Sequence, residues 1–290
     1  MSTVMIPGKG DVLLAADVLG DDTAPPIVLL HGGGQTRHSW KRSAGRFADA
    51  GYYVVNIDLR GHGQSGWSSS RAYQIGDFAD DVRHVVDWIG RPGVLVGASL
   101  GGISSLLAAG EDPAVPLVAL VLVDVVPAIN ESGSKHIGDF MNAPDGFASV
   151  NEAADAVSRY LPHRPRPADI SGLRRNLRRG RDGRWYWHFD PNFMTELRMA
   201  RALDRLNAAA SRVTVPTLLI RGGLSEIVDD AGAAAFRAVV PHAEERMVSR
   251  AAHMVAGDEN DHFTQAVFDF LARVHPADDA TAGGRPSVSP

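Results

Sequence analysis

The sequence lacks cysteine altogether, and only 7% of its residues are aromatic. Disulfide bridges and thiolate metal sites are therefore excluded, and the composition fits a reducing compartment. Long hydrophobic runs are also missing. The longest, 115–126, is interrupted by Pro116 and Asp124 and is too short to cross a bilayer. Because no basic segment followed by an apolar one opens the chain, we predict a cytoplasmic protein.

Strong charge of one sign is absent as well, since the formal net charge is −5 over 290 residues. Chains that bind nucleic acids are usually basic, so we expect neither a nucleic-acid partner nor a membrane partner. The histidines are scattered without the spacing of a ligand cluster, which predicts no metal. No phosphate-binding glycine motif occurs, and we expect no cofactor. The composition leaves the oligomeric state open between monomer and dimer.

What the sequence does contain is a regular alternation of short apolar segments with segments of helical period. Segments 27–30, 94–98 and 117–123 are almost entirely apolar, as is typical of strands buried on both faces. Further strands are predicted at 12–18, 53–57, 217–220 and 244–248, and a helix along the apolar stripe of 75–89. This pattern predicts an α/β fold, with a mostly parallel twisted sheet flanked by helices.

The alternation stops after Pro127 and resumes near residue 212. We predict a core made of 1–127 and 212–275, with a helical cap at 128–211 inserted after the strand that ends near Asp124. The tail 276–290 has no apolar period and is predicted to be disordered. Between Arg159 and Arg184 the cap holds nine arginines and two acidic residues. They form either a solvated helix face or an entrance that favours anionic substrates.

The segment 94–102 carries the most specific motif. An apolar strand ends in Gly-Ala-Ser-Leu-Gly, and an apolar helical stretch follows. This order is typical of a nucleophile elbow, a tight turn with the serine at its apex. Ser99 would then stand at a helix N-terminus, where developing negative charge is favoured. The alternative is a glycine-rich turn in which Ser99 only caps the helix.

A nucleophilic serine needs a base and a third group that orients this base. His253 lies in a loop just after the last predicted strand, at the sheet edge where catalytic groups of parallel sheets gather. For the acid we favour Glu226, in the loop after strand 217–220. The alternative is Asp124, which otherwise ties loops together through backbone N–H groups.

Acyl transfer also requires two N–H donors for the oxyanion of its transition state. One is expected from Leu100, which follows the serine. The other is expected from the glycine-rich segment 31–34, after strand 27–30, with Gly33 preferred over Gly34. His31 is expected to organise these loops.

Together these residues resemble the α/β-hydrolase superfamily. The resemblance rests on His31-Gly-Gly-Gly34, on Asp58-Leu-Arg-Gly-His-Gly-Gln-Ser65, on Gly97-Ala-Ser-Leu-Gly101 and on the late His253. Within it, the chain is similar to the epoxide-hydrolase-like and cofactor-free haloperoxidase-like branch. The resemblance implies a cap domain where the insertion lies. Epoxide hydrolases carry an aspartate at the elbow, whereas the serine here favours an acyl-enzyme.

The resulting prediction is a serine hydrolase that cleaves a small-molecule carboxylic ester or lactone. One candidate substrate is a monoester that bears a carboxylate. Trp40, Trp185, Trp187 and Met254 are predicted to line the substrate pocket, although aromatic packing between cap and core would explain the tryptophans equally well. A carbon–carbon bond hydrolase, a perhydrolase and a non-enzymatic ligand receptor are the alternatives, because a fold does not fix a chemistry.

Overall fold

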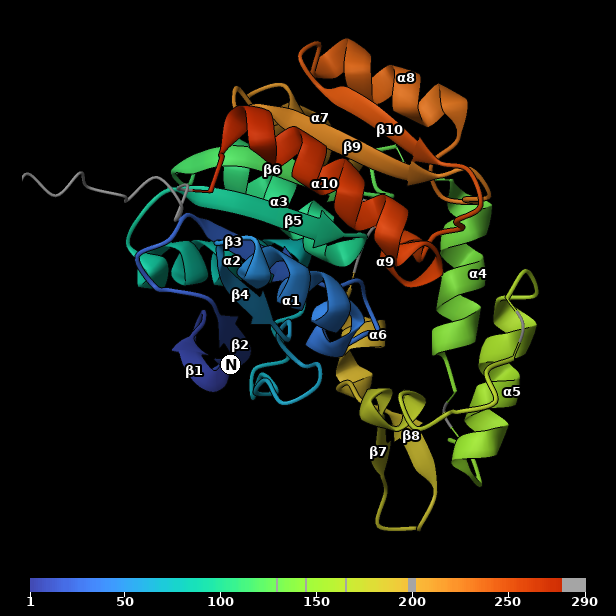
Figure 1. Ribbon diagram of the computed structural model, residues 1–290. Helices are drawn as coiled ribbons and strands as arrows, with labels where there is room; N and C mark the ends of the chain where they lie inside the picture. Colours follow the sequence, from blue (N-terminus) through green and yellow to red (C-terminus); the bar gives the residue numbers. More distant parts are fainter. Residues whose placement is uncertain (129, 144, 165, 198–201, 278–290) are drawn as a thin grey trace, which may run out of the picture.

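The computed structural model describes residues 1–128, 130–143, 145–164, 166–197 and 202–277. Its centre is an eight-stranded sheet in the order β1-β2-β4-β3-β5-β6-β9-β10 (Figure 1). The strands are β1 (Ser2–Pro7), β2 (Leu13–Leu19), β3 (Pro26–Leu30), β4 (Tyr53–Ile57), β5 (Gly93–Ala98), β6 (Leu117–Val123), β9 (Thr217–Gly222) and β10 (Glu244–Val248). β2 pairs antiparallel with β1 and with β4, and all other pairings in this sheet are parallel. The predicted sheet is confirmed, and β1 is an addition that the periodicity did not indicate.

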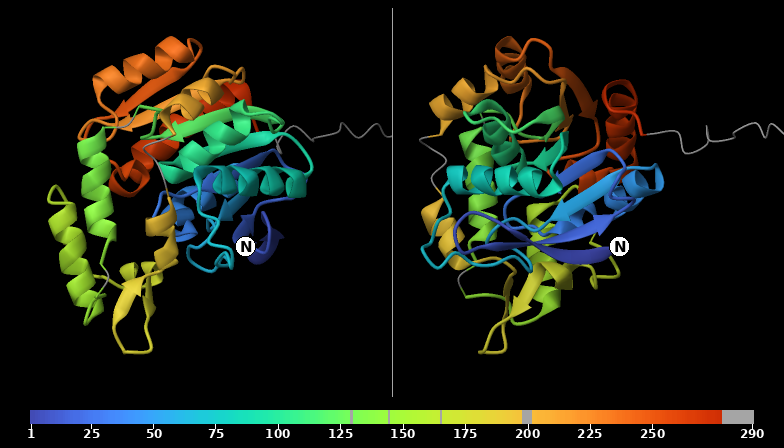
Figure 2. Two further views of the ribbon diagram at one scale, coloured as in Figure 1. Left: turned by 180° about the vertical axis from the view of Figure 1, so that it is seen from behind. Right: turned by 90° about the vertical axis from the view of Figure 1, so that its left-hand side faces the viewer.

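Helices cover both faces of this sheet (Figures 1 and 2). They are α1 (Lys41–Asp49), α2 (Ile75–Ile89), α3 (Leu100–Gly110), α7 (Leu203–Ala210), α8 (Asp230–Val239), α9 (Val255–Asp258) and α10 (Asn260–Val274). The helix predicted over 75–89 is therefore confirmed as α2.

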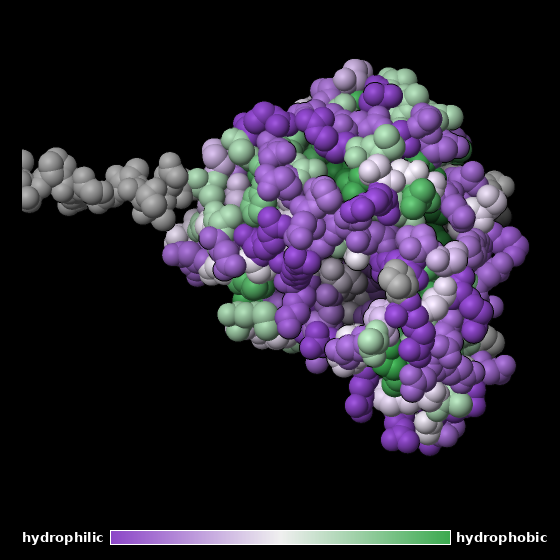
Figure 3. All heavy atoms as spheres, turned by 45° about the vertical axis from the view of Figure 1, so that its right-hand side comes forward, coloured by the Kyte–Doolittle hydropathy of each residue, from purple (hydrophilic) through white to green (hydrophobic). Residues whose placement is uncertain are grey.

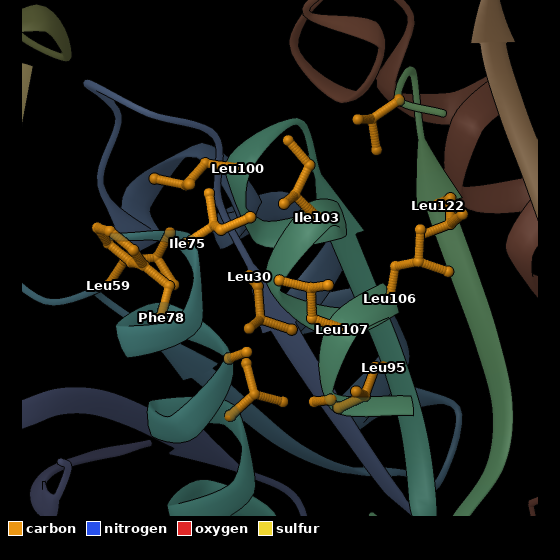
Figure 4. Packing of buried hydrophobic residues seen from close by; sticks show 14 of the residues in the cluster. Leu30, Leu59, Ile75, Phe78, Leu95, Leu100, Ile103, Leu106, Leu107 and Leu122 are labelled. Atoms are coloured by element: carbon orange, nitrogen blue, oxygen red, sulfur yellow. The ribbon is translucent and has the colours of Figure 1, made fainter. Parts of the chain in front are cut away.

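The alternation of strand side chains explains the two helical layers. In β3, Val28 and Leu30 belong to the buried cluster that includes α2 and α3, whereas Ile27 and Leu29 belong to the cluster that includes α1 and α10. Successive residues of a strand point to opposite faces, so a strand covered on both sides must be apolar throughout. Figure 4 shows the first cluster, in which side chains of α2 and α3 meet those of β3 and β5.

Between β6 and β9 the chain leaves the sheet and forms an insertion. Its elements are α4 (Glu131–Met141), α5 (Val150–Tyr160), the 3-10 turn η2 (Leu173–Asn176), β7 (Leu177–Arg179), β8 (Trp185–Trp187) and α6 (Pro191–Glu196). β7 and β8 pair as an antiparallel hairpin, which corrects the expectation of a purely helical cap. Strands of three residues are too short to show the alternation on which a sequence-based prediction depends.

α7 lies within the range predicted for the cap, but it packs against α3. Its Leu206 and Ala209 are buried in the same cluster as α2 and α3. This helix therefore belongs to the core layer, and the insertion ends before residue 203. Of the tail predicted at 276–290, residues 278–290 lie outside the described residues. In the described part of the chain, no helix has the length and apolar character that crossing a membrane requires.

Candidate active site

Ser99 occupies the sharp turn between β5 and α3. Its backbone angles, φ 48° and ψ −115°, lie where residues other than glycine are seldom found. Two glycines allow the turn to close. A Cβ on Gly97 would lie 2.5 Å from the carbonyl carbon of Gly101, and a Cβ on Gly101 would lie 2.4 Å from the carbonyl oxygen of Leu30. Since α3 begins at Leu100, the serine stands at a helix N-terminus.

A buried carboxylate holds the imidazole of His253. The ring nitrogen Nδ1 donates to Oδ2 of Asp124 at 2.7 Å. Asp124 directly follows β6, has a φ of 50° and is completely buried. Its carboxylate also accepts from the hydroxyl of Ser225 at 2.5 Å and from the backbone N–H of Gly222 at 3.0 Å. With Nδ1 engaged, Nε2 is the ring nitrogen left for a second partner.

Glu226, which the sequence favours as the acid, lies elsewhere. Its side chain is 69% exposed and pairs with Nδ1 of His136 at 3.1 Å. The turn after β9 explains this placement, because the Ser225 hydroxyl accepts from two backbone N–H groups of the turn while it donates to Asp124. Residue 225 thereby faces inward and residue 226 faces α4. The carboxylate behind His253 is Asp124, and the prediction of Glu226 there is wrong.

Two neutral histidines hold the loops around the elbow. Nε2 of His31 accepts from the N–H of Leu59, and Nε2 of His62 accepts from the N–H of Gly34, each at 3.0 Å. Burial lowers the pKa of His31 to about 4 and the pKa of His62 to about 3. Both rings therefore accept as neutral imidazoles at pH 7. The amide of Gly34, which was the alternative to Gly33 as the second oxyanion donor, is therefore already bonded to His62.

The glycine loop after β3 lies against the elbow. A Cβ on Gly32 would be 3.3 Å from Cβ of Ser99, and the N–H of Gly101 donates to the carbonyl of His31 at 3.2 Å. Gly33 and Leu100 both border the same cavity as Ser99. Their placement suits two amide donors that act on one oxygen, which stays a prediction.

The segment Asp58–Ser65 forms a frame for the site. The buried carboxylate of Asp58 accepts from two backbone N–H groups, at 2.7 and 2.9 Å. The same segment bonds to the insertion through the backbone. The N–H of Gly63 donates to the carbonyl of His188 at 2.9 Å, and the N–H of Asp190 donates to the carbonyl of Gly61 at 2.8 Å. Asp190 then caps α6, so the frame anchors this end of the insertion.

A cavity of about 480 Å³ adjoins Ser99 and His253. The core supplies its polar end, which also includes residues 32–35. The insertion supplies a largely apolar wall that includes Ile137, Phe140, Met141, Val157, Leu161 and Phe193. The face of the molecule seen in Figure 3 is mostly hydrophilic, with small, separate apolar areas. The insertion therefore turns much of its apolar side toward the cavity.

The four predicted pocket residues divide evenly. Trp187 and Met254 line the cavity. Trp40 is 1% exposed and packs on Phe263 in the cluster at the other face of the sheet, with ring centroids 5.4 Å apart. Trp185 pairs with residue 147 in a β-bridge and lies beneath a guanidinium. The assignment of Trp40 and Trp185 to the pocket is therefore wrong, because both pack elsewhere.

Several arginines of the insertion are engaged in ring contacts, ion pairs or backbone hydrogen bonds. Arg178 lies over the rings of Trp67 and Tyr186, at 5.4 and 5.1 Å from their centroids. Among the described residues that line the cavity, Arg164 is the one that carries a formal charge independent of pH near 7. Its guanidinium is already paired with the carboxylate of Asp258.

Metal-ligating side chains do not gather anywhere in the described ranges in groups of three or more. The absence of a cofactor stays a prediction.

The sheet order, the strained serine at the elbow and the bond between buried Asp124 and His253 together define an α/β hydrolase. Residues 22–260 match the family described as serine aminopeptidase, S33, and the chain belongs to this family of α/β hydrolases.

Relatives and solved structures agree with this assignment. The chain is 30% identical to an esterase of Mycobacterium tuberculosis over 82% of this chain and 79% of the relative. It is 30% identical to an sn-1-specific diacylglycerol lipase of Mus musculus over 87% and 83% of the two chains. The structure of E-2-(acetamidomethylene)succinate hydrolase is similar with a TM-score of 0.80 at 24% identity, covering 93% of this chain and 99% of that one, and supports the fold alone.

Proposed function

We propose that this hydrolase cleaves carboxylic esters or lactones through an acyl-enzyme formed on Ser99. Carboxylic ester hydrolysis is supported by two relatives, an esterase and a lipase, at 30% identity over most of the chain. The acyl-enzyme on Ser99 is supported by one observation, the 2.7 Å hydrogen bond between His253 Nδ1 and Asp124. This bond leaves the second ring nitrogen for the serine in the same cavity.

In the first half of the reaction, Nε2 of neutral His253 takes the proton of the Ser99 hydroxyl as its oxygen attacks the ester carbonyl. The carbonyl oxygen becomes an oxyanion, which the N–H groups of Gly33 and Leu100 stabilise. The loss of one such donor typically raises the barrier by about 3 kcal/mol. Asp124 fixes the tautomer of the ring and stabilises the imidazolium.

In the second half, the imidazolium gives its proton to the departing alkoxide, and the acyl group remains on Ser99. Water then enters, loses a proton to His253 and attacks the acyl carbonyl. Collapse of this intermediate releases the acid and returns the proton to the serine oxygen. The Ser225 hydroxyl keeps the Asp124 carboxylate aligned throughout, since it donates to the same oxygen as His253.

For the substrate we propose an uncharged ester of medium size. The insertion offers the cavity mostly apolar side chains, which favour an alkyl or aryl group. A monoester that bears a carboxylate would need a cation without a partner, but the guanidinium of Arg164 is paired with Asp258. The paired arginine therefore supports a neutral substrate over an anionic one.

A panel of p-nitrophenyl esters of increasing acyl length, together with lactones and a carbon–carbon-cleavable diketone, tests this proposal. Ser99→Ala is the blank for every substrate. We expect ester turnover that Ser99→Ala abolishes, and covalent labelling of the wild type alone by a fluorophosphonate. Turnover of the diketone without the esters would favour a carbon–carbon hydrolase. Ligand binding without any turnover would favour a receptor.

A matched pair of esters of equal size, one neutral and one with a terminal carboxylate, tests the substrate class. The expected result is a higher kcat/KM for the neutral ester. Equal or reversed values would contradict the proposed preference.

A further inference from the structure

The loop that carries His253 is bonded to the insertion through a buried carboxylate. Asp258, the last residue of α9, has a side chain that is only 3% exposed. Its Oδ2 accepts from the backbone N–H of Ala252 at 2.8 Å. Its Oδ1 pairs with Nε of Arg164 and with Nε2 of His163, the latter at 3.2 Å. Asp258 therefore links the turn after α5 to the residue directly before His253.

Arg164 also reaches the residue directly after His253. Its Nη2 donates to the carbonyl of Met254 at 3.4 Å, and the same carbonyl accepts from the backbone N–H groups of Gly257 and Asp258 at 2.8 Å each. The guanidinium lies close over α9, since a Cβ on Gly257 would be 2.9 Å from Nη2. The backbone on both sides of the histidine is thus held by one ion pair.

This ion pair differs from an ordinary surface salt bridge. Exposed pairs contribute little because water screens both charges. A buried carboxylate that loses a cationic partner is costly, so the position of Asp258 depends on Arg164, with His163 as its other side-chain partner. Arg164 borders the cavity, as do Val157, Tyr160 and Leu161 of the same turn and helix. The ion pair thereby connects the wall that contacts the substrate with the loop that holds the base.

We infer that Arg164 is a positioning residue, which acts through Asp258 and the Met254 carbonyl to hold His253 beside Ser99. The inference rests on the proposed function of His253 as the base. Misplacement of a catalytic group by about 1 Å can cost about 100-fold in rate. Loosening this loop should therefore lower kcat more than it raises KM.

The test compares Arg164→Gln with Arg166→Gln. Arg166 lies two residues further on and bonds to Asp155 and Asn151 of α5, within the insertion. With a short neutral p-nitrophenyl ester, we expect kcat of Arg164→Gln to fall about tenfold, with KM within about twofold. Arg166→Gln should keep the wild-type values. Arg164→Lys should recover only part of the loss, because its ammonium can pair with Asp258 but lacks the second donor that reaches the Met254 carbonyl.

A second readout does not require turnover. The Nδ1 proton of His253, hydrogen-bonded to Asp124, should give a proton NMR resonance far downfield, which Asp124→Asn identifies by its loss. We expect this resonance to broaden in Arg164→Gln and to persist in Arg166→Gln.

An unchanged resonance and an unchanged kcat in Arg164→Gln would overturn the inference. Equal losses in both glutamine variants, which point to general loosening of the insertion, would also overturn it. So would a loss limited to anionic esters with a raised KM, which would make Arg164 a substrate-binding group. If instead Ser99→Ala kept full activity, the proposed function would fail, while the NMR comparison would still report on the loop.

Discussion

Two regions meet at the cavity, and the chain constrains them differently. The core loops around Ser99 and His253 are fixed by backbone strain, by glycines that admit no side chain and by buried hydrogen bonds. The insertion supplies apolar side chains and bonds to the core through Asp190 and Arg164. A change in the core should therefore affect chemistry or folding, whereas a change in the apolar wall of the insertion should mainly affect substrate choice.

The largest expected effect contrasts the two candidate acids. Asp124→Asn should lower kcat/KM about 10⁴-fold, because the ring of His253 loses the acceptor that fixes its tautomer. Glu226→Gln should change kcat/KM less than about twofold, since an exposed ion pair with His136 contributes little. Ester hydrolysis by both purified variants measures the difference. A large loss in Glu226→Gln would restore the acid that the sequence favours.

The next contrast concerns the tryptophans. Trp40→Ala should destabilise the fold by about 3–5 kcal/mol, because it empties a fully buried site against Phe263. Trp187→Ala should instead shift the preferred acyl length toward longer esters, because it removes part of the cavity wall. Trp185→Ala should leave this preference unchanged. Urea unfolding and the ester panel are the measurements, and a shifted preference in Trp185→Ala would contradict the described cavity.

Acidification should weaken the core through two buried histidines. The pKa values of His31 and His62 in the folded chain, about 4 and about 3, lie below that of free imidazole. Between pH 6.5 and these values the unfolded chain binds protons that the folded chain excludes, so the free energy of unfolding falls as pH falls. Each of the two histidines should lower the free energy of unfolding by about 2 kcal/mol between pH 7 and pH 5.

Urea unfolding at these two pH values checks this expectation. His31→Gln should reduce the difference in unfolding free energy between pH 7 and pH 5, even if it also lowers stability at pH 7. Arg166→Gln, which changes an exposed arginine of the insertion, should leave that difference as it is in the wild type. An equal difference in all three proteins would argue against His31 as a source of the acid sensitivity.

The smallest effect concerns Ser225, which sequence reasoning did not identify. Ser225→Ala removes a 2.5 Å hydrogen bond to Asp124 and leaves those from His253 and Gly222. We expect kcat/KM to fall about tenfold, the equivalent of one hydrogen bond to a charged group. Steady-state kinetics of Ser225→Ala and Ser225→Thr should show partial recovery with threonine, whose hydroxyl can still donate.

The nucleophile elbow and His253 could be predicted from the sequence because both depend on local sequence patterns. Only a narrow set of residues can surround Ser99 in so tight a turn, and His253 lies just beyond a recognisable strand. The choice between Glu226 and Asp124 depends on which way each side chain faces. That direction is set by the positive φ of Asp124 and by the bonds of Ser225, which only the assembled sheet edge reveals.

The structure of the insertion was harder to predict because its local sequence patterns are weak. Its hairpin β7–β8 is too short to show a period, and its helices carry no motif that states which side faces the cavity. Trp40 and Trp187 look alike in sequence, yet the first lies under α10 and the second beside the substrate space. Aromatic residues report burial, but their partners depend on contacts far along the chain.

Asp124 and Ser225 stand side by side behind His253, so the carboxylate has a neighbouring position in the next loop. β6 and β9 are adjacent, and the groups at their ends meet at one carboxylate oxygen. An exchange that places the carboxylate at 225 and a hydroxyl at 124 would present the same ring nitrogen with an acceptor from the next strand. In this chain the negative charge stands after β6, the strand next to β5 and its serine, and the neighbouring strand β9 leads to the hydroxyl that supports it.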